Sequence, residues 1–87
     1  MKKYEFEDMK YRGSSGYAWN LRYYWEIEFP NGYGASVISQ EGGYELAVIV
    51  DGQIVYNTPI TKNVVYCVDK AHVVKLLNNI ARLESSE

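Results

Sequence analysis

Apolar and polar residues alternate along much of the chain, which is the pattern of strands that bury one face. The clearest case is the segment Tyr17–Phe29, in which every odd position is apolar or aromatic and most even positions are polar. The segment exceeds the usual length of a strand, so we expect a break near Asn20 and a strand over Leu21–Phe29. A weaker alternation predicts a first strand over Tyr4–Tyr11, with an irregularity near Asp8.

Clusters of Gly, Pro, Asn and Asp separate the predicted strands, because these residues adopt turn conformations at low cost. Turns or loops are expected at 13–16, 30–32 and 40–43, which leaves strands at 33–39, 44–50 and 53–56. Asp51-Gly52 is typical of a two-residue hairpin turn that pairs Val50 with Gln53. This hairpin has apolar residues on both faces, so both faces need cover. The small residues 34–36 leave room for a bulky side chain, for which the tryptophans and tyrosines are candidates.

The C-terminal segment has the spacing of an amphipathic helix, with an apolar stripe and an N-cap residue at Asp69. The stripe consists of Val73, Leu76, Leu77, Ile80 and Leu83. Residues 58–63 are predicted as a loop and 84–87 as a frayed tail, whereas Val64–Val68 fits either a strand or a buried connector. The sequence therefore predicts one α+β domain over 1–87, an antiparallel β-sheet meander of four to five strands packed on one C-terminal α-helix. Its parts are a Tyr-rich N-terminal arm (1–24), the meander (25–68) and the helix (69–84).

Charge and cysteine content narrow the function classes. The formal net charge is −2, and the stretch from Gly13 to Thr61 has one basic residue against five acidic ones, which disfavours binding to phosphate backbones. The single cysteine excludes an internal disulfide and favours a reducing compartment. The N-terminus lacks the apolar core of a signal peptide, and the longest apolar run, Leu46–Val50, is far too short to span a membrane. We expect a cytoplasmic protein that does not associate with membranes.

Two residue pairs are candidates for chemistry. Cys67 and His72 are close enough in sequence to form a thiolate–imidazole pair, although no third orienting group is identifiable. Glu26 and Glu28 share one face of a predicted strand, as paired carboxylates do in acid–base sites, but a solvated outer face accounts for them more simply. One histidine and one cysteine do not supply the ligands of a zinc site. We therefore expect no catalytic residues, metal or cofactor.

Tyrosine is the most informative residue type, because the chain has nine tyrosines and two tryptophans, none of them in the predicted helix. Part of this excess reflects the preference of aromatic residues for strands. One short helix cannot bury all of these rings, however, and surface Tyr and Trp are enriched in protein interfaces. The sequence therefore predicts a protein-binding face formed by Tyr11, Tyr17, Trp19, Tyr23, Tyr24, Trp25 and Tyr33.

Two separated motifs resemble a family of short bacteriophage-encoded proteins. The motifs are FPNGYGASVI (Phe29–Ile38), followed by YELAV (Tyr44–Val48), and NTPIT (Asn57–Thr61). The resemblance extends from about Trp25 to Leu83 and leaves the Tyr-rich arm outside it. It implies a phage or prophage origin but no activity, and it assigns no catalytic or ligand-binding residues. If one part is specific to the task of this protein, the arm is the leading candidate.

These observations favour a small non-enzymatic phage or prophage protein that binds a host or phage protein through an aromatic sheet surface, as a monomer or after forming a homodimer. By analogy with other small acidic phage domains, a sharper hypothesis is inhibition of a host defence system such as a CRISPR effector complex. A nucleic-acid or nucleotide-binding accessory protein is one alternative. A small enzyme that uses the paired carboxylates or the Cys/His pair is another.

Overall fold

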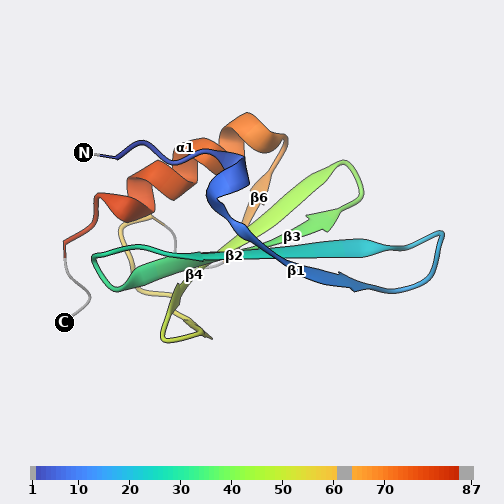
Figure 1. Cartoon of the computed structure of the whole chain (residues 1–87), viewed down its shortest axis with the longest axis horizontal. Coiled ribbons are helices and arrows are strands. Elements are labelled where there is room, and N and C mark those ends of the chain that lie inside the picture. The colour runs from blue at the N-terminus through green and yellow to red at the C-terminus, as the bar shows by residue number, and fades with distance from the viewer. Residues whose placement is uncertain (1, 61–63, 85–87) are drawn as a thin grey trace.

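The α+β architecture predicted from the sequence is confirmed in a computed structural model, which describes residues 2–60 and 64–84 (Figure 1). An antiparallel sheet packs on one C-terminal helix, and a short 3₁₀ helix lies near the N-terminus. The predicted loop at 58–63 and tail at 84–87 fall partly outside the described residues. The elements are η1 (Phe6–Asp8), β1 (Lys10–Ser15), β2 (Arg22–Glu28), β3 (Tyr33–Gln40), β4 (Gly43–Val50), β5 (Gln53–Ile54), β6 (Val65–Cys67) and α1 (Lys70–Ala81).

The strands β1 to β4 are hydrogen-bonded to one another in sequence order, as expected for a meander. Two short strands share the outer edge of β4. Strand β5 pairs with its C-terminal end and β6 with its N-terminal end. The ambiguous segment Val64–Val68 therefore contains a strand, which returns the chain to the sheet just before the helix.

Two predicted local features are confirmed by geometry. Asp51 and Gly52 both have positive φ, 52° and 78°, as a two-residue hairpin turn of right-handed twist requires, and Val50 pairs with Gln53. Asp69 is the N-cap of α1, and its Oδ1 accepts a hydrogen bond from the backbone N of His72 at 2.9 Å.

One face of the sheet is covered by two elements rather than by the helix alone. Val73, Leu77 and Ile80 of α1 are fully buried against the sheet. Beside the helix lies the segment 2–9, which we call the strap. Asn78 of α1 holds the strap, because its side chain accepts from the backbone N of Tyr4 at 2.8 Å and donates to the Tyr4 carbonyl at 2.9 Å. Three side chains of the strap complete the core, namely Tyr4, Phe6 and Met9.

The prediction of a strand over Tyr4–Tyr11 is therefore wrong for most of its length. Asp8 closes a 3₁₀ turn instead, since its Oδ2 accepts from the backbone N of Glu5. The turn shifts the phase of the chain, so that Met9 joins Tyr4 and Phe6 in the core, which a straight strand with a period of two would not allow.

The loop predicted at 13–16 is also misplaced. Gly13–Ser15 belong to β1 and pair with β2, after a bulge between Tyr11 and Gly13, and the turn lies further on, over 16–21. The break expected near Asn20 is confirmed, because the Asn20 backbone N donates to the Tyr17 carbonyl and β2 begins at Arg22.

The other face of the sheet, which we call the open face, has no covering layer in the described part of the chain (Figure 1). It still encloses two of its own apolar residues, Ala47 and Ile49, which are 6% and 3% exposed. Ile49 is opposite Gly34 in the register and lies against it, so that a Cβ on Gly34 would be 3.1 Å from the Ile49 Cγ1. At Gly34, the bulky side chain in this space is thus Ile49, not an aromatic ring.

Candidate protein-binding surface

The hairpin formed by β1 and β2 reaches beyond the part of the sheet that α1 and the strap cover (Figure 1). The two parts of the Tyr-rich N-terminal arm therefore lie in different places. Its first part, the strap, packs on the sheet, and its second part forms one side and the tip of a projecting hairpin. Side chains on the helix side of this hairpin have no helix above them.

Three rings form what we call the aromatic row on the helix side of the hairpin. Tyr11 pairs with Trp25 in the register, and its ring centroid is 6.1 Å from that of Trp25 and 6.4 Å from that of Tyr23. Tyr11 and Tyr23 are 53% and 40% exposed. Trp25 is half-buried, because Phe6 of the strap packs edge-on against it at 5.1 Å. The row thus extends from the core outward, from the half-buried ring of Trp25 to the exposed rings of Tyr11 and Tyr23.

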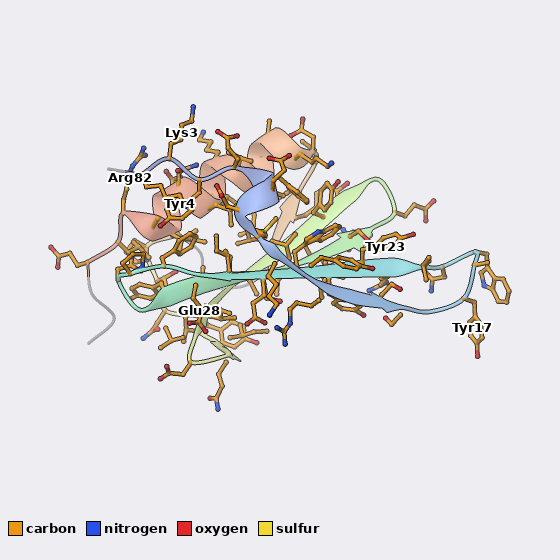
Figure 2. All side chains as sticks on the ribbon, viewed as in Figure 1. Lys3, Tyr4, Tyr17, Tyr23, Glu28 and Arg82 are labelled. Atoms are coloured by element: carbon orange, nitrogen blue, oxygen red, sulfur yellow. The ribbon has the colours of Figure 1, made fainter. Side chains whose placement is uncertain are left out.

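Two further rings form the tip pair at the far end of the hairpin. Tyr17 and Trp19 are stacked, with centroids 5.1 Å apart and an interplanar angle of 11°. Figure 2 shows Tyr17 at the end of the hairpin, far from the helix. The two residues are 71% and 84% exposed, so their stacking covers only a small part of either ring. Large rings in this degree of contact with water are typical of binding surfaces.

The structure brings five of the seven predicted binding residues onto the hairpin's helix side and tip, and places the other two elsewhere. Tyr24 lies on the open face, where its hydroxyl is 2.6 Å from the Oγ of Ser15. Tyr33 begins β3 at the opposite end of the sheet and is half-buried against the core. The alternation along β2 explains the first separation, because neighbours in a strand face opposite sides.

Sequence reasoning missed two features of this surface. Leu21, 41% exposed, directly precedes β2 and extends the exposed apolar area between the row and the tip. The hairpin also differs in charge from the rest of the chain, since the stretch from Met9 to Trp25 contains Lys10, Arg12 and Arg22 but no acidic residue. The difference becomes visible only when the charges are counted over the part of the hairpin that projects in the structure, because the predicted strands also include Glu5, Glu7, Asp8, Glu26 and Glu28.

The cations lie away from the aromatic row. Lys10 pairs with Glu26, and both line a shallow depression together with Arg12 and Glu28. Figure 2 shows Glu28 pointing from the open face. Arg22 precedes Tyr23 in β2 and therefore faces the opposite side from it, which is the open face that Lys10 and Glu26 share. The helix side of the hairpin is thus aromatic, whereas the open side carries charges of both signs.

This mixed-charge depression also contains the paired carboxylates considered above. Glu28 is exposed and Glu26 is partly exposed, and basic side chains lie beside both. This setting is that of a solvated outer face rather than of a desolvated acid–base pair.

The Cys67 thiol lies in a setting that opposes nucleophilic chemistry. Cys67 is fully buried in β6, and burial, followed by the negative charge of Asp69, raises the pKa of its thiol from 9.0 to about 11. The thiol is therefore protonated at neutral pH, whereas a nucleophile needs the thiolate. His72, in the first turn of α1, is half-buried.

Residues 2–60 and 64–84 contain neither a cluster of metal ligands nor a membrane-spanning helix. Within these ranges, no three His, Cys, Asp or Glu side chains are grouped so that they could hold a metal ion. In the same part of the chain, α1 is too short to cross a bilayer and no other helix has the required length and hydrophobicity.

Comparisons of the chain with protein-family models, with curated proteins and with solved structures each gave no match. The resemblance to short bacteriophage-encoded proteins therefore stays a prediction that depends on its two motifs.

Proposed function

We propose that this protein is a non-enzymatic binding protein, of phage or prophage origin, that contacts a host or phage protein with the aromatic row and the tip pair. The exposure of Trp19 at 84%, at the end of a projecting hairpin, is the observation that carries the proposal. Buried Trp and Tyr side chains supply much of the binding energy in protein interfaces. In the sharper form of this proposal, the contacted protein belongs to a host defence complex, which the binding inhibits.

Three properties of the hairpin support this proposal. The aromatic row lies on strands that the core fixes through Trp25 and Phe6, so this part of the surface needs little ordering on binding. Its helix side combines exposed rings with few charges, which is the composition of an interface core. Cations such as Arg22 lie on the reverse side of the sheet and stay in water when the helix side is covered.

Site-specific photo-crosslinking tests the proposal. A photoreactive phenylalanine analogue replaces Trp19 in one variant and Tyr56 in a control; Tyr56 is 53% exposed and lies outside the hairpin. After irradiation in host cells, the variant at position 19 should give a defined crosslinked protein and the variant at position 56 should not. Equal crosslinking at the two positions, or none at position 19, would contradict the proposal.

A second candidate function is binding of single-stranded nucleic acid, because the hairpin combines exposed rings with three cations. The acidic neighbours of Lys10 and Arg12 oppose it. A fluorescence titration with a single-stranded oligothymidylate at low salt, where phosphate contacts are strongest, separates the two functions. Quenching of Trp19 that disappears with rising salt would favour nucleic acid.

A further inference from the structure

The exposed hairpin surface has a composition that can also be complementary to itself. The side chains concerned are Tyr11, Tyr17, Trp19, Leu21 and Tyr23, whose exposed fractions are given above. None of them carries a charge at neutral pH, and four of the five are aromatic. A surface of this kind can pack against a copy of itself without placing like charges together.

The homodimer considered from the sequence had a different basis, the second apolar face of the hairpin that begins with β4. The structure weakens that basis, because Ala47 and Ile49 on this face are buried within one chain, although Ile54 and Tyr56 are 45% and 53% exposed. The more exposed rings lie in the aromatic row and the tip pair, where Trp19 is 84% exposed.

The exposed area is sufficient for a specific dimer. With roughly 200 Å² for one fully exposed aromatic residue, the five side chains present on the order of 600 Å² per chain. Complete coverage of two such surfaces would bury at most on the order of 1,200 Å², which is at the lower end of the range for specific protein–protein interfaces.

The charges distinguish between the ways in which two hairpins could meet. Strand β1 is an edge of the sheet, and pairing of two β1 edges would bring Lys10 and Arg12 of both copies close together. Basic side chains on an edge strand are a common protection against such pairing. Contact between the helix sides of the two hairpins leaves these cations in water.

We infer that, in the free protein, the aromatic row and the tip pair are covered by the same surface of a second copy, in a two-fold symmetric dimer. The inference rests on the proposed function, since it assigns an occupant to the same binding surface. The tip pair of each copy lies over the aromatic row of the other in this arrangement, and an external partner would have to displace the second copy.

Sedimentation equilibrium from low to high micromolar concentration tests the inference. The particle mass should rise from 10.0 kDa toward twice that value. The double variant Tyr11→Ser/Tyr23→Ser should stay monomeric, whereas the control Tyr56→Ser should still dimerise. Far-UV circular dichroism and a thermal melt establish that each variant is folded. A monomer at high micromolar concentration, or a dimer that the double variant leaves intact, would overturn the inference.

Tryptophan emission gives a second measurement that does not depend on a variant. Trp19 loses contact with water when the dimer forms, so the emission maximum should move to shorter wavelength as concentration rises. An unchanged maximum across the dimerisation range would contradict the inference. A monomer that still crosslinks a host protein from position 19 would overturn the dimer and leave the proposed function standing, whereas a dimer without such crosslinking would do the reverse.

Discussion

Asn31, in the turn between β2 and β3, caps the C-terminal end of α1 through the carbonyl of Ile80. Its Nδ2 donates to that carbonyl at 2.8 Å and to the Leu83 carbonyl at 3.0 Å. The last carbonyls of a helix lack the usual partners further along the helix. The Ile80 carbonyl also accepts from the backbone N of Leu83 at 3.1 Å, so Asn31 adds a donor from another element. The Oδ1 of the same residue accepts from the backbone N of Tyr33 and thereby closes the turn. One side chain thus fixes both the hairpin and its distance from the helix.

We expect Asn31→Ala to lower the free energy of unfolding by about 2 kcal/mol, because the Ile80 and Leu83 carbonyls each lose a donor and the backbone N of Tyr33 loses its acceptor. Asn31→Asp keeps an acceptor for Tyr33 but places a negative charge at the negative end of the helix dipole, so it should be at least as destabilising. Urea denaturation measures both, with exposed Asn57→Ala as a control near zero. An effect of Asn31→Ala as small as that of the control would contradict the capping role.

Asn78 should be the main attachment of the strap. Asn78→Ala leaves the backbone N and carbonyl of Tyr4 without their partners, and we expect a loss of about 2 kcal/mol. Amide hydrogen exchange gives the sharper measurement, since protection at Tyr4 should fall while protection in β3 changes little. Asn79→Ala, on a less buried position of the same helix, is the control. Retained protection at Tyr4 would show that ring packing alone holds the strap.

Local patterns predicted the parts of the fold that depend on near neighbours. The turn at Asp51-Gly52 and the cap at Asp69 are such cases, because donor, acceptor and φ preference lie within a few residues. Asn78 appeared to be an ordinary polar position of an amphipathic helix, since its partner Tyr4 is 74 positions away. The capping role of Asn31 was missed for the same reason.

The candidate surface shows the same limit. The alternation along β2 predicted that Tyr23 and Trp25 share a face, and the structure confirms it. Tyr24 was grouped with them for its ring, although the same alternation places it on the opposite face. The position of Tyr11 depends on a bulge in β1 and on a 3₁₀ turn before it, and neither has a clear local signature.

Gly34 is required by two close approaches. A Cβ at this position would overlap the carbonyl oxygen of Ile27 and would press on Ile49. We expect Gly34→Ala to cost about 2 kcal/mol through overpacking and displacement of β2. The double variant Gly34→Ala/Ile49→Ala should not recover the stability of the wild type, because the overlap with the Ile27 carbonyl remains. Ser36→Ala, on the same face of β3, is the matched control, and full recovery in the double variant would show that Ile49 alone sets the requirement.

The two tryptophans should differ strongly in their access to water. At low micromolar concentration, acrylamide should quench Trp19 readily, whereas Trp25 is shielded by Phe6 and Tyr44. The wild type should therefore give a curved Stern–Volmer plot with two populations. Trp19→Phe should remove the readily quenched population and leave the other. If the quenching of this variant matches that of the wild type, the tip pair is not exposed as described.

Cys67 should make stability fall at alkaline pH. Burial, and to a smaller extent Asp69, raises the pKa of this thiol from 9.0 to about 11, so the folded state binds its proton more tightly than the unfolded state. Stability from this group is constant below pH about 9 and declines as the pH rises from about 9 to about 11, because only the unfolded state ionises freely there. Cys67→Ala should be less stable at neutral pH but should decline less across this range. Urea denaturation of both proteins at matched pH values measures the difference, in which the titration of tyrosines and lysines largely cancels. If the free energy of unfolding declines in parallel for the two proteins, the thiol has the same pKa in the folded and unfolded states.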